Sequence, residues 1–372
     1  MKKCIVFGEE HFNSLGIIRS LGEGGIRPVA IILRGSKRIT SASRYISDLH
    51  IVNGIEEGYQ LMLEQYGDKK DKPYIFTSDD RTTSFLDQHY EELKDYFIFF
   101  NAGEKNRITY YMNKDNINRI AIRHGLNVLE AIPVKKGIVP KDIEYPIITK
   151  AIASTIGDWK KDVFVCHNDE ELMEAYKHIR SETVLLQKYI VKKNELCLEA
   201  FSSNRGKNLF IAIASNYNYQ LPQGYSYYMT VHNLKNPELE NKLAGMIEEI
   251  GFEGIMEIEF LIGQDDQLYF CEVNFRNSTW SYAATVAGMN LPILWIKSME
   301  EKSIPKNAYK EVKPGFTAIV EPNDFRVRVK SHMTGMITWI KEFMQSDCKY
   351  YLGRKDLGPI WSIVKDKIRK TK

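Results

Sequence analysis

The chain has 372 residues, of which 44% are hydrophobic and 27% are charged, and its formal net charge is +3. This length exceeds one typical hydrophobic core, so two or three globular domains are expected. The small net charge gives no support for a nucleic-acid partner, and no apolar stretch is long enough for a membrane span or a signal peptide.

The cysteines and histidines argue against a disulfide-bonded protein and against a zinc site. The five cysteines are scattered and include no CxxC pair, which fits reduced thiols in a cytoplasmic protein. The eight histidines form no ligand cluster in the sequence, which argues against a zinc site.

The N-terminal part of the chain has the pattern of a doubly wound α/β domain. A helix with apolar residues at helical spacing ends at Gly24, and Ser78-Asp79-Asp80 follows an apolar run, at the kind of sheet edge where ligands bind. The segment 8–16 does not read GxGxxG, so a dinucleotide site is not favoured. Short apolar runs indicate buried strands at 4–7, 29–33 and 74–77.

A second region begins with a helix that Asn113 can cap, because an apolar stripe follows it. After Pro133 the composition shifts toward short strands. Strands are expected at 146–150, 163–166, 184–190, 195–202, 208–214 and 316–320, and helices at 169–180, 238–250 and 333–344. The basic tail at 365–372 can touch an anionic surface weakly, but a solvated, fraying end is the simpler interpretation.

The most informative feature is a hairpin with strands at 254–262 and 268–274 and a polar turn between them. Because side chains alternate along a strand, antiparallel pairing gives one face that is wholly apolar. This register sets Phe260 opposite Cys271 and Ile262 opposite Tyr269, so Cys271 is interpreted as a core residue.

The other face of the hairpin sets Glu259 opposite Glu272 and Glu257 opposite Asn274. Like charges in directly opposed positions are destabilising, and no Lys or Arg of the hairpin shares this face. A divalent cation would turn the repulsion into attraction, and carboxylate and amide oxygens are the ligands that Mg²⁺ prefers. The alternative is an exposed hairpin with a hydrated acidic face.

Two other segments carry groups that suit a nucleotide. Lys150 ends an apolar strand and can place a point charge on a phosphate, although a lysine there is often only solvated. The strand edge at 187–190 can bind an adenine through backbone groups, and Glu195 can accept hydrogen bonds from ribose hydroxyls. Each of these signals is weak alone. The stronger indication is their order along the chain: Lys114, Lys150, the segment 187–195, and then the acidic hairpin.

That order resembles the ATP-grasp superfamily of carboxylate–amine ligases. Glu272-Val273-Asn274-Phe275-Arg276 resembles the Glu-x-Asn-x-Arg motif of the family, and 251–254 and the N-terminal segment also look similar to it. The resemblance implies the following roles: Mg²⁺ ligands, with Mn²⁺ as a substitute (Glu259, Glu272, Asn274); phosphate contacts (Lys114, Lys150); adenine contacts (Gln187 and the main chain of Lys188 and Ile190); ribose contact (Glu195); and stabilisation of the transferred phosphoryl group (Arg276).

The resemblance implies a fold in which an α/β domain precedes two α+β subdomains that clamp ATP. Expected boundaries are 1–112, 113–205 for the lid, 206–325 for the metal-binding part and 326–372 for a helical extension. One departure is that the phosphate-covering segment 154–161 contains only Gly157, whereas the family usually has a glycine-rich loop. Lys160 or Lys161 would then replace backbone donors, or the lid closes differently.

The implied activity is ATP-dependent amide formation through an acyl phosphate, with small-molecule carboxylate and amine substrates. Segment 352–359 and the N-terminal pattern look similar to D-aspartate ligases, which implies an amino acid joined to a cell-wall or surface-polysaccharide precursor; the large chain of carbamoyl phosphate synthase is another similar group. A homodimer is the common expectation for such ligases. The alternatives are an ATP-grasp kinase that stops at phosphate transfer, and a non-catalytic nucleotide-binding module.

Overall fold

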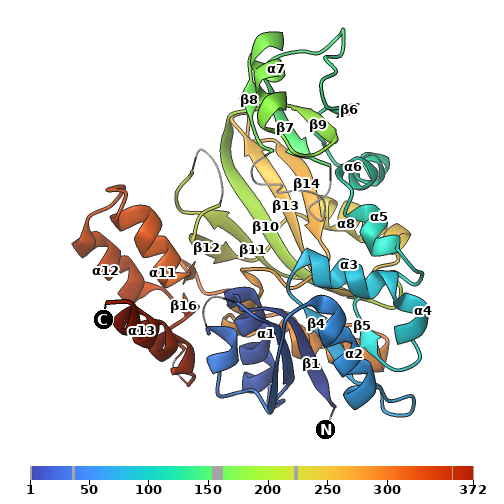
Figure 1. Cartoon of the computed structure of the whole chain (residues 1–372), viewed down its shortest axis with the longest axis vertical. Coiled ribbons are helices and arrows are strands. Elements are labelled where there is room, and N and C mark those ends of the chain that lie inside the picture. Colours follow the sequence, from blue (N-terminus) through green and yellow to red (C-terminus); the bar gives the residue numbers. More distant parts are fainter. Residues whose placement is uncertain (1, 36–37, 153–161, 222–224, 354, 372) are drawn as a thin grey trace.

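The structure, a computed structural model, describes residues 2–35, 38–152, 162–221, 225–353 and 355–371. Its N-terminal part is a five-stranded parallel sheet in the order β3-β2-β1-β4-β5 (Figure 1). The strands are β1 (Cys4–Glu9), β2 (Val29–Leu33), β3 (Asp48–Val52), β4 (Tyr74–Thr77) and β5 (Ile98–Phe99). The helices are α1 (Phe12–Glu23), α2 (Ile55–Tyr66), α3 (Asp80–Gln88), α4 (Tyr90–Leu93) and α5 (Arg107–Tyr111).

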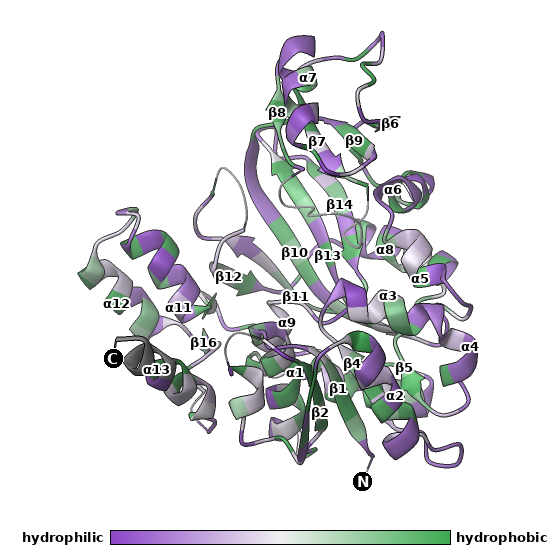
Figure 2. Cartoon of the chain, in the orientation of Figure 1, coloured by the Kyte–Doolittle hydropathy of each residue, from purple (hydrophilic) through white to green (hydrophobic). Residues whose placement is uncertain are grey.

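This sheet is covered on both faces, as expected for a doubly wound domain. Val6 and Ile32 pack into one hydrophobic cluster, whereas their neighbours Phe7 and Ile31 pack into another. Figure 2 shows β1 and β2 as hydrophobic, while the helices around them carry both hydrophilic and hydrophobic stretches. The strands predicted at 29–33 and 74–77 are confirmed with the same bounds.

The second body is a four-stranded antiparallel sheet in the order β6-β9-β7-β8, which lies at the top of Figure 1. Helix α6 (Lys114–Arg123) precedes it, and the Asn113 side chain caps that helix as predicted. The other elements are β6 (Ala131–Lys135), β7 (Ile147–Ala151), β8 (Val165–Cys166), α7 (Asp169–His178) and β9 (Thr183–Lys188).

The third body is a seven-stranded sheet in the order β14-β13-β10-β11-β12-β15-β16. Sheet membership changes between Lys188 and Lys192, so the segment 113–205 predicted as the lid also includes the first strand of the larger sheet. The strands are β10 (Lys192–Ser203), β11 (Asn208–Tyr217), β12 (Tyr228–His232), β13 (Gly254–Gly263), β14 (Leu268–Asn274), β15 (Thr317–Ile319) and β16 (Cys348–Lys349). The helices are α8 (Pro237–Ile250), α9 (Ser281–Val286) and α10 (Leu291–Glu301).

The chain ends in a helical lobe, coloured red at the side of the molecule in Figure 1, which we call the C-terminal lobe (residues 321–371). It contains α11 (Glu321–Asp324), a π-helical turn at Phe325–Val329, α12 (Met336–Gln345) and α13 (Gly358–Thr371). The tail predicted as a fraying end is therefore helical to residue 371. Within the described ranges, no helix is both long and apolar enough to cross a membrane.

Candidate active site

The acidic face of the β13–β14 hairpin has the predicted register at its centre. Glu259 pairs with Glu272, and Glu257 pairs with Asn274. Nearer the turn the register shifts by one residue, because a β-bulge follows the Glu259–Glu272 pair. Phe260 therefore pairs with Phe270 rather than with Cys271, which corrects the predicted pairing of the apolar face.

The same bulge changes the interpretation of Cys271. This residue has no strand partner in the register, and its thiol is only half-buried instead of lying in the core. It interacts electrostatically with Lys150 and Lys114, and so it borders the proposed nucleotide site. A regular alternation rule cannot detect an inserted residue, which is why the sequence prediction for Cys271 is wrong.

Asn274 is the centre of a continuous polar network. Its Nδ2 donates to the Glu257 carboxylate at 3.0 Å and to the Glu259 carboxylate at 2.7 Å. Its Oδ1 accepts a hydrogen bond from the Arg276 guanidinium at 3.0 Å. The Arg276 Nε donates in turn to Asp80 at 2.7 Å, which connects this network to the N-terminal domain.

Glu272 is ion-paired with Lys114, which lies in the first turn of α6. Burial favours the neutral carboxyl group, but the ammonium groups of Lys114 and Lys150 outweigh it and hold the pKa of Glu272 below its usual range. The balance is different at Glu259. Its pKa is raised well above the usual range by burial and by the neighbouring charges of Glu257 and Glu272.

These side chains fit a divalent cation. Glu259, Glu272 and Asn274 supply two carboxylates and an amide oxygen, which are hard oxygen ligands, and magnesium usually completes its shell with water and substrate phosphates. Burial and the charges of Glu257 and Glu272 raise the pKa of Glu259, so a cation bound here would favour its ionised form. Within the residues that the structure describes, no group of three or more His, Cys, Asp or Glu side chains is arranged to hold a metal ion, so a cation here would depend on the amide and the nucleotide.

Lys150 approaches the same group of side chains from the four-stranded sheet. It lies on β7, and its ammonium group donates to the Gln187 side chain on β9 at 2.7 Å. Burial lowers the pKa of Lys150, and the positive charge of Lys114 lowers it further. Lys150 also interacts electrostatically with Glu272 and Glu195. The two predicted phosphate lysines therefore approach one another from helix α6 and strand β7.

The residues predicted to contact the adenine and the ribose lie on β9, on β10 and in the segment between them. The Lys188 N–H donates to the Glu130 carbonyl at 2.8 Å, so the Lys188 carbonyl oxygen is the main-chain group that remains for the predicted contact with the ring. Ile190 follows β9 outside any strand. Glu195 lies on β10 with its carboxylate ion-paired to Lys192. The segment 154–161, with Gly157, Lys160 and Lys161, lies outside the described residues.

Sequence reasoning missed two residues that contact this network. Asp80 directly follows a predicted strand, so the strand-end signal was present, but its pairing with Arg276 joins positions far apart in the chain. Glu199 lies opposite Glu257 on β10, is fully buried and accepts hydrogen bonds from Ser278 and Ser281. Alternation along the predicted strand 195–202 would have put Glu199 on the same face as Glu195.

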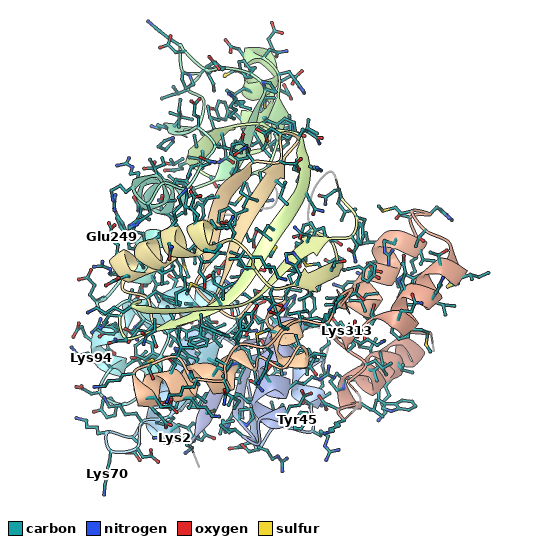
Figure 3. All side chains as sticks on the ribbon, turned by 180° about the vertical axis from the view of Figure 1, so that it is seen from behind. Lys2, Tyr45, Lys70, Lys94, Glu249 and Lys313 are labelled. Carbon is teal, nitrogen blue, oxygen red and sulfur yellow. The ribbon has the colours of Figure 1, made fainter. Side chains whose placement is uncertain are left out.

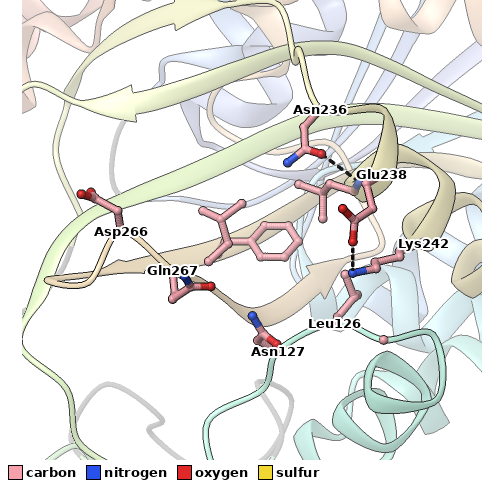
Figure 4. A pocket seen from close by; sticks show the side chains of 11 residues that line it. Leu126, Asn127, Asn236, Glu238, Lys242, Asp266 and Gln267 are labelled. Atoms are coloured by element: carbon pink, nitrogen blue, oxygen red, sulfur yellow. Dashed lines mark hydrogen bonds and ion pairs between the residues drawn. The ribbon is translucent and has the colours of Figure 1, made fainter.

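A separate cavity of about 300 Å³ lies behind the hairpin and contains none of the predicted site residues (Figure 4). It is lined by Phe260 and Leu268, together with Asn236 and Lys242 from the start and middle of α8. Phe260 is adjacent to Glu259, so its side chain points to the opposite face of the sheet. The candidate active site is instead the polar face of β13 and β14 beneath the four-stranded sheet.

Residues 113–299 match the family model described as the carbamoyl-phosphate synthase L chain, ATP binding domain. This segment covers half of the chain and contains every site residue named from the sequence.

Individual proteins are similar over more of the chain. The 2-oxoglutarate carboxylase small subunit of Hydrogenobacter thermophilus is 22% identical over 288 residues, which is 70% of this chain; the chain spans only 58% of the length of that relative. A solved structure of N5-carboxyaminoimidazole synthetase from Staphylococcus aureus has a TM-score of 0.65 and 16% identity, covering 89% of this chain and 86% of that one.

Two further solved structures share the fold. The L-amino acid ligase from Bacillus licheniformis has a TM-score of 0.65 at 15% identity, covering 86% of this chain and 80% of that chain. The biotin carboxylase domain of the Hydrogenobacter thermophilus 2-oxoglutarate carboxylase, solved with MgADP and bicarbonate, has a TM-score of 0.64 at 19% identity and covers 87% and 76%. At these identities the likeness establishes the ATP-grasp fold.

Proposed function

Because this chain belongs to the family of the carbamoyl-phosphate synthase L chain ATP-binding domain and has the ATP-grasp fold, we propose that it is an ATP-dependent carboxylate–amine ligase. One observation supports this most directly. Glu259 and Glu272 lie opposite each other on β13 and β14. Asn274 and Arg276 are hydrogen-bonded beside Glu259, and Lys114 is ion-paired to Glu272.

The proposal assigns a contact with the metal or the nucleotide to each site residue predicted from the sequence. Glu259, Glu272 and Asn274 would hold Mg²⁺, or Mn²⁺ in its place, and the cation would neutralise charge on the nucleotide phosphates. Lys114 and Lys150 would bind phosphate oxygens from α6 and β7. Gln187, Lys188 through its carbonyl, and Ile190 would contact the adenine, and Glu195 would accept hydrogen bonds from the ribose hydroxyls.

The proposed reaction solves a leaving-group problem. An oxygen of the substrate carboxylate attacks the γ-phosphorus of ATP, the bond to the bridging oxygen breaks, and ADP leaves, which produces an acyl phosphate. The nitrogen of the amine then attacks the carbonyl carbon and loses a proton. The bond from this carbon to the phosphate oxygen breaks, so that inorganic phosphate leaves and the amide is formed. Arg276 would stabilise the charge on the transferred phosphoryl group, so that catalysis consists mainly of positioning and charge neutralisation.

The finer part of the proposal concerns the substrates. We infer an amino acid as one substrate and a cell-wall or surface-polysaccharide precursor as the acceptor, on the sequence resemblance described above. The two remaining functions differ in measurable ways. A kinase would form a phosphorylated product without an amine, and a binding module would release no ADP.

The experiment compares Glu272→Gln with the native chain in an ADP-release assay over a panel of amino acids, with and without amine acceptors. Losing this carboxylate should reduce ADP formation by about 10²–10³-fold, as for removal of other charge-stabilising groups, with no change in the circular dichroism spectrum. Glu301→Gln, an exposed substitution on α10, is the matched control and should retain full activity. Undiminished turnover in Glu272→Gln would remove the proposed metal site.

A further inference from the structure

Helix α12 exposes a continuous apolar stripe. Ile337 is 86% exposed and Met344 is 70% exposed, and Met336 and Ile340 are each 48% exposed. Their spacing along the helix puts all four on one side. No residue of α12 is buried, so this helix leaves a hydrophobic face without a partner in the described part of the chain. Contiguous exposed apolar surface of this kind usually marks a binding site.

The opposite side of α12 accounts for its position in the fold. Trp339 Nε1 donates to the Asp324 carboxylate at 2.8 Å, and the Phe343 ring stacks on Trp339 at 5.3 Å between centroids. Arg328 pairs with Glu342 at 2.7 Å. The helix is therefore anchored through its inner face, and the apolar stripe is not needed to hold it.

Helix α13 repeats the arrangement. Leu357, directly before the helix, is 46% exposed, and Trp361 in its first turn is 59% exposed. Val364 continues the stripe at 39% exposed. A large exposed tryptophan is unusual in a surface that only meets water, whereas tryptophan is favoured where an apolar phase meets water. Figure 3, seen from behind, shows the C-terminal lobe at the edge of the molecule, with side chains projecting outward from its helices.

The charge of the chain is concentrated in the same place. Residues 326–372 contain twelve Lys and Arg against four Asp and Glu, a net charge of +8, so the preceding 325 residues carry −5 of the total of +3. Lys341 on α12 and Lys365 on α13 are exposed. Lys341 lies beside Ile337 around the helix axis, so a cation borders the apolar stripe.

We propose that the apolar stripes of α12 and α13 bind the surface of an anionic lipid membrane. Two exposed amphipathic helices with Met, Ile and Trp on one face and Lys beside it have the composition of interfacial helices. Each cation near an anionic lipid surface adds to the attraction, and apolar burial in the headgroup region adds to it independently. Binding is peripheral, since neither helix is long enough to span.

Charge favours a membrane over a second copy of the chain. A symmetric dimer through this face would bring together two copies of the segment 326–372, each with a net charge of +8, and the repulsion would oppose the apolar contact. A bilayer that contains anionic lipid offers both an apolar phase and opposite charge. The surface is also separate from Lys114, Glu259 and Glu272, so binding does not depend on the proposed ligase chemistry.

Sedimentation of the full chain with phosphatidylcholine vesicles, with and without phosphatidylglycerol, tests the proposal. We expect co-sedimentation only with phosphatidylglycerol, weakened by raised salt. Ile337→Asp should reduce the bound fraction about tenfold. It removes an apolar side chain that the bilayer would bury, and it brings a negative charge to the anionic surface. Lys365→Glu should weaken binding about fivefold, and the remaining binding should depend less on the salt concentration.

The matched control is Ile122→Asp, at an isoleucine that is 60% exposed on α6, and it should bind vesicles like the native chain. Circular dichroism of each variant establishes that the fold is retained. Absence of vesicle binding by the native chain overturns the proposal. Equal loss in Ile122→Asp, or a dimer in light scattering that Ile337→Asp dissolves without any vesicle binding, also overturns it, the latter in favour of a second copy.

Discussion

Glu257 and Glu199 face each other across β13 and β10, and both are buried. Burial, together with the charge of Glu199, raises the pKa of Glu257 to about 8. Burial also raises the pKa of Glu199 to about 7, against the hydrogen bonds from Ser278 and Ser281. At neutral pH this pair therefore holds a proton that exposed carboxyl groups would lose.

A dependence of stability on pH follows from this pair. Between pH ~4.5 and ~8 the folded chain retains a proton that the unfolded chain has released, so the free energy of unfolding falls by a few kcal/mol as pH rises through this range and levels off above it. Urea denaturation in metal-free buffer at several pH values measures this slope. Glu257→Gln should flatten it, whereas exposed Glu56→Gln should leave it unchanged; equal slopes in all three chains would contradict the assignment.

At the scale of elements, α6 matters because its first residue is Lys114. The Asn113 side chain accepts hydrogen bonds from the N–H groups of Asp115 and Asn116, and the Lys114 N–H donates to the Ile152 carbonyl at 2.9 Å. The cap therefore determines where the helix begins and where the lysine side chain starts. Asn168 caps α7 in the same way, accepting from the Glu171 N–H at 2.9 Å, but α7 carries no site residue.

These two caps form a matched pair of substitutions. Asn113→Ala and Asn168→Ala should each lower the free energy of unfolding by about 1 kcal/mol, the usual cost of losing a capping side chain. Only Asn113→Ala should also raise the KM for ATP several-fold, because it loosens the helix start that positions Lys114. Thermal unfolding and ADP-release kinetics provide the two measurements, and an equal rise in KM for both variants would contradict a positioning role for Asn113.

At the scale of the whole molecule, one buried arginine joins the two ends of the chain. Arg19 on α1 donates to the Asp356 carboxylate at 2.9 Å and to the carbonyl oxygens of Tyr350 at 2.6 Å and Tyr351 at 3.1 Å. Arg19 is 0% exposed and Asp356 is 1% exposed. The C-terminal lobe is therefore fixed to the N-terminal domain by an ion pair that is buried from solvent.

Arg19→Gln should destabilise the chain by about 3 kcal/mol, since it leaves the Asp356 carboxylate buried without its cation. Limited proteolysis should then cut between β16 and α13, where the native chain resists. Arg27→Gln removes an exposed arginine that donates to the carbonyl oxygens of Arg44 and Ile46, and it should cost less than about 1 kcal/mol. Similar melting temperatures for the two variants would show that the buried pair does not anchor the lobe.

The sequence alone determined the features that depend on near neighbours. Alternation along two adjacent strands placed Glu259 opposite Glu272 and Glu257 opposite Asn274, and capping chemistry placed the start of α6 at Asn113. Both rest on spacing rules that act over a few residues, because strand and helix periods are fixed by backbone geometry. The resemblance of the Glu-x-Asn-x-Arg segment to ATP-grasp ligases likewise needed no tertiary contact, and the family match over 113–299 confirms it.

Only the tertiary structure decided the features that join distant segments. The pairing of Asp80 with Arg276 and the approach of Lys150 to Glu272 depend on how the three sheets pack. The position of Glu199 beside Glu257 depends on the pairing of β10 with β13 within one sheet. The bulge that moves Cys271 out of the core is an inserted residue that strand periodicity does not encode. Such contacts depend on the balance of burial and charge over the whole fold, which local patterns do not contain.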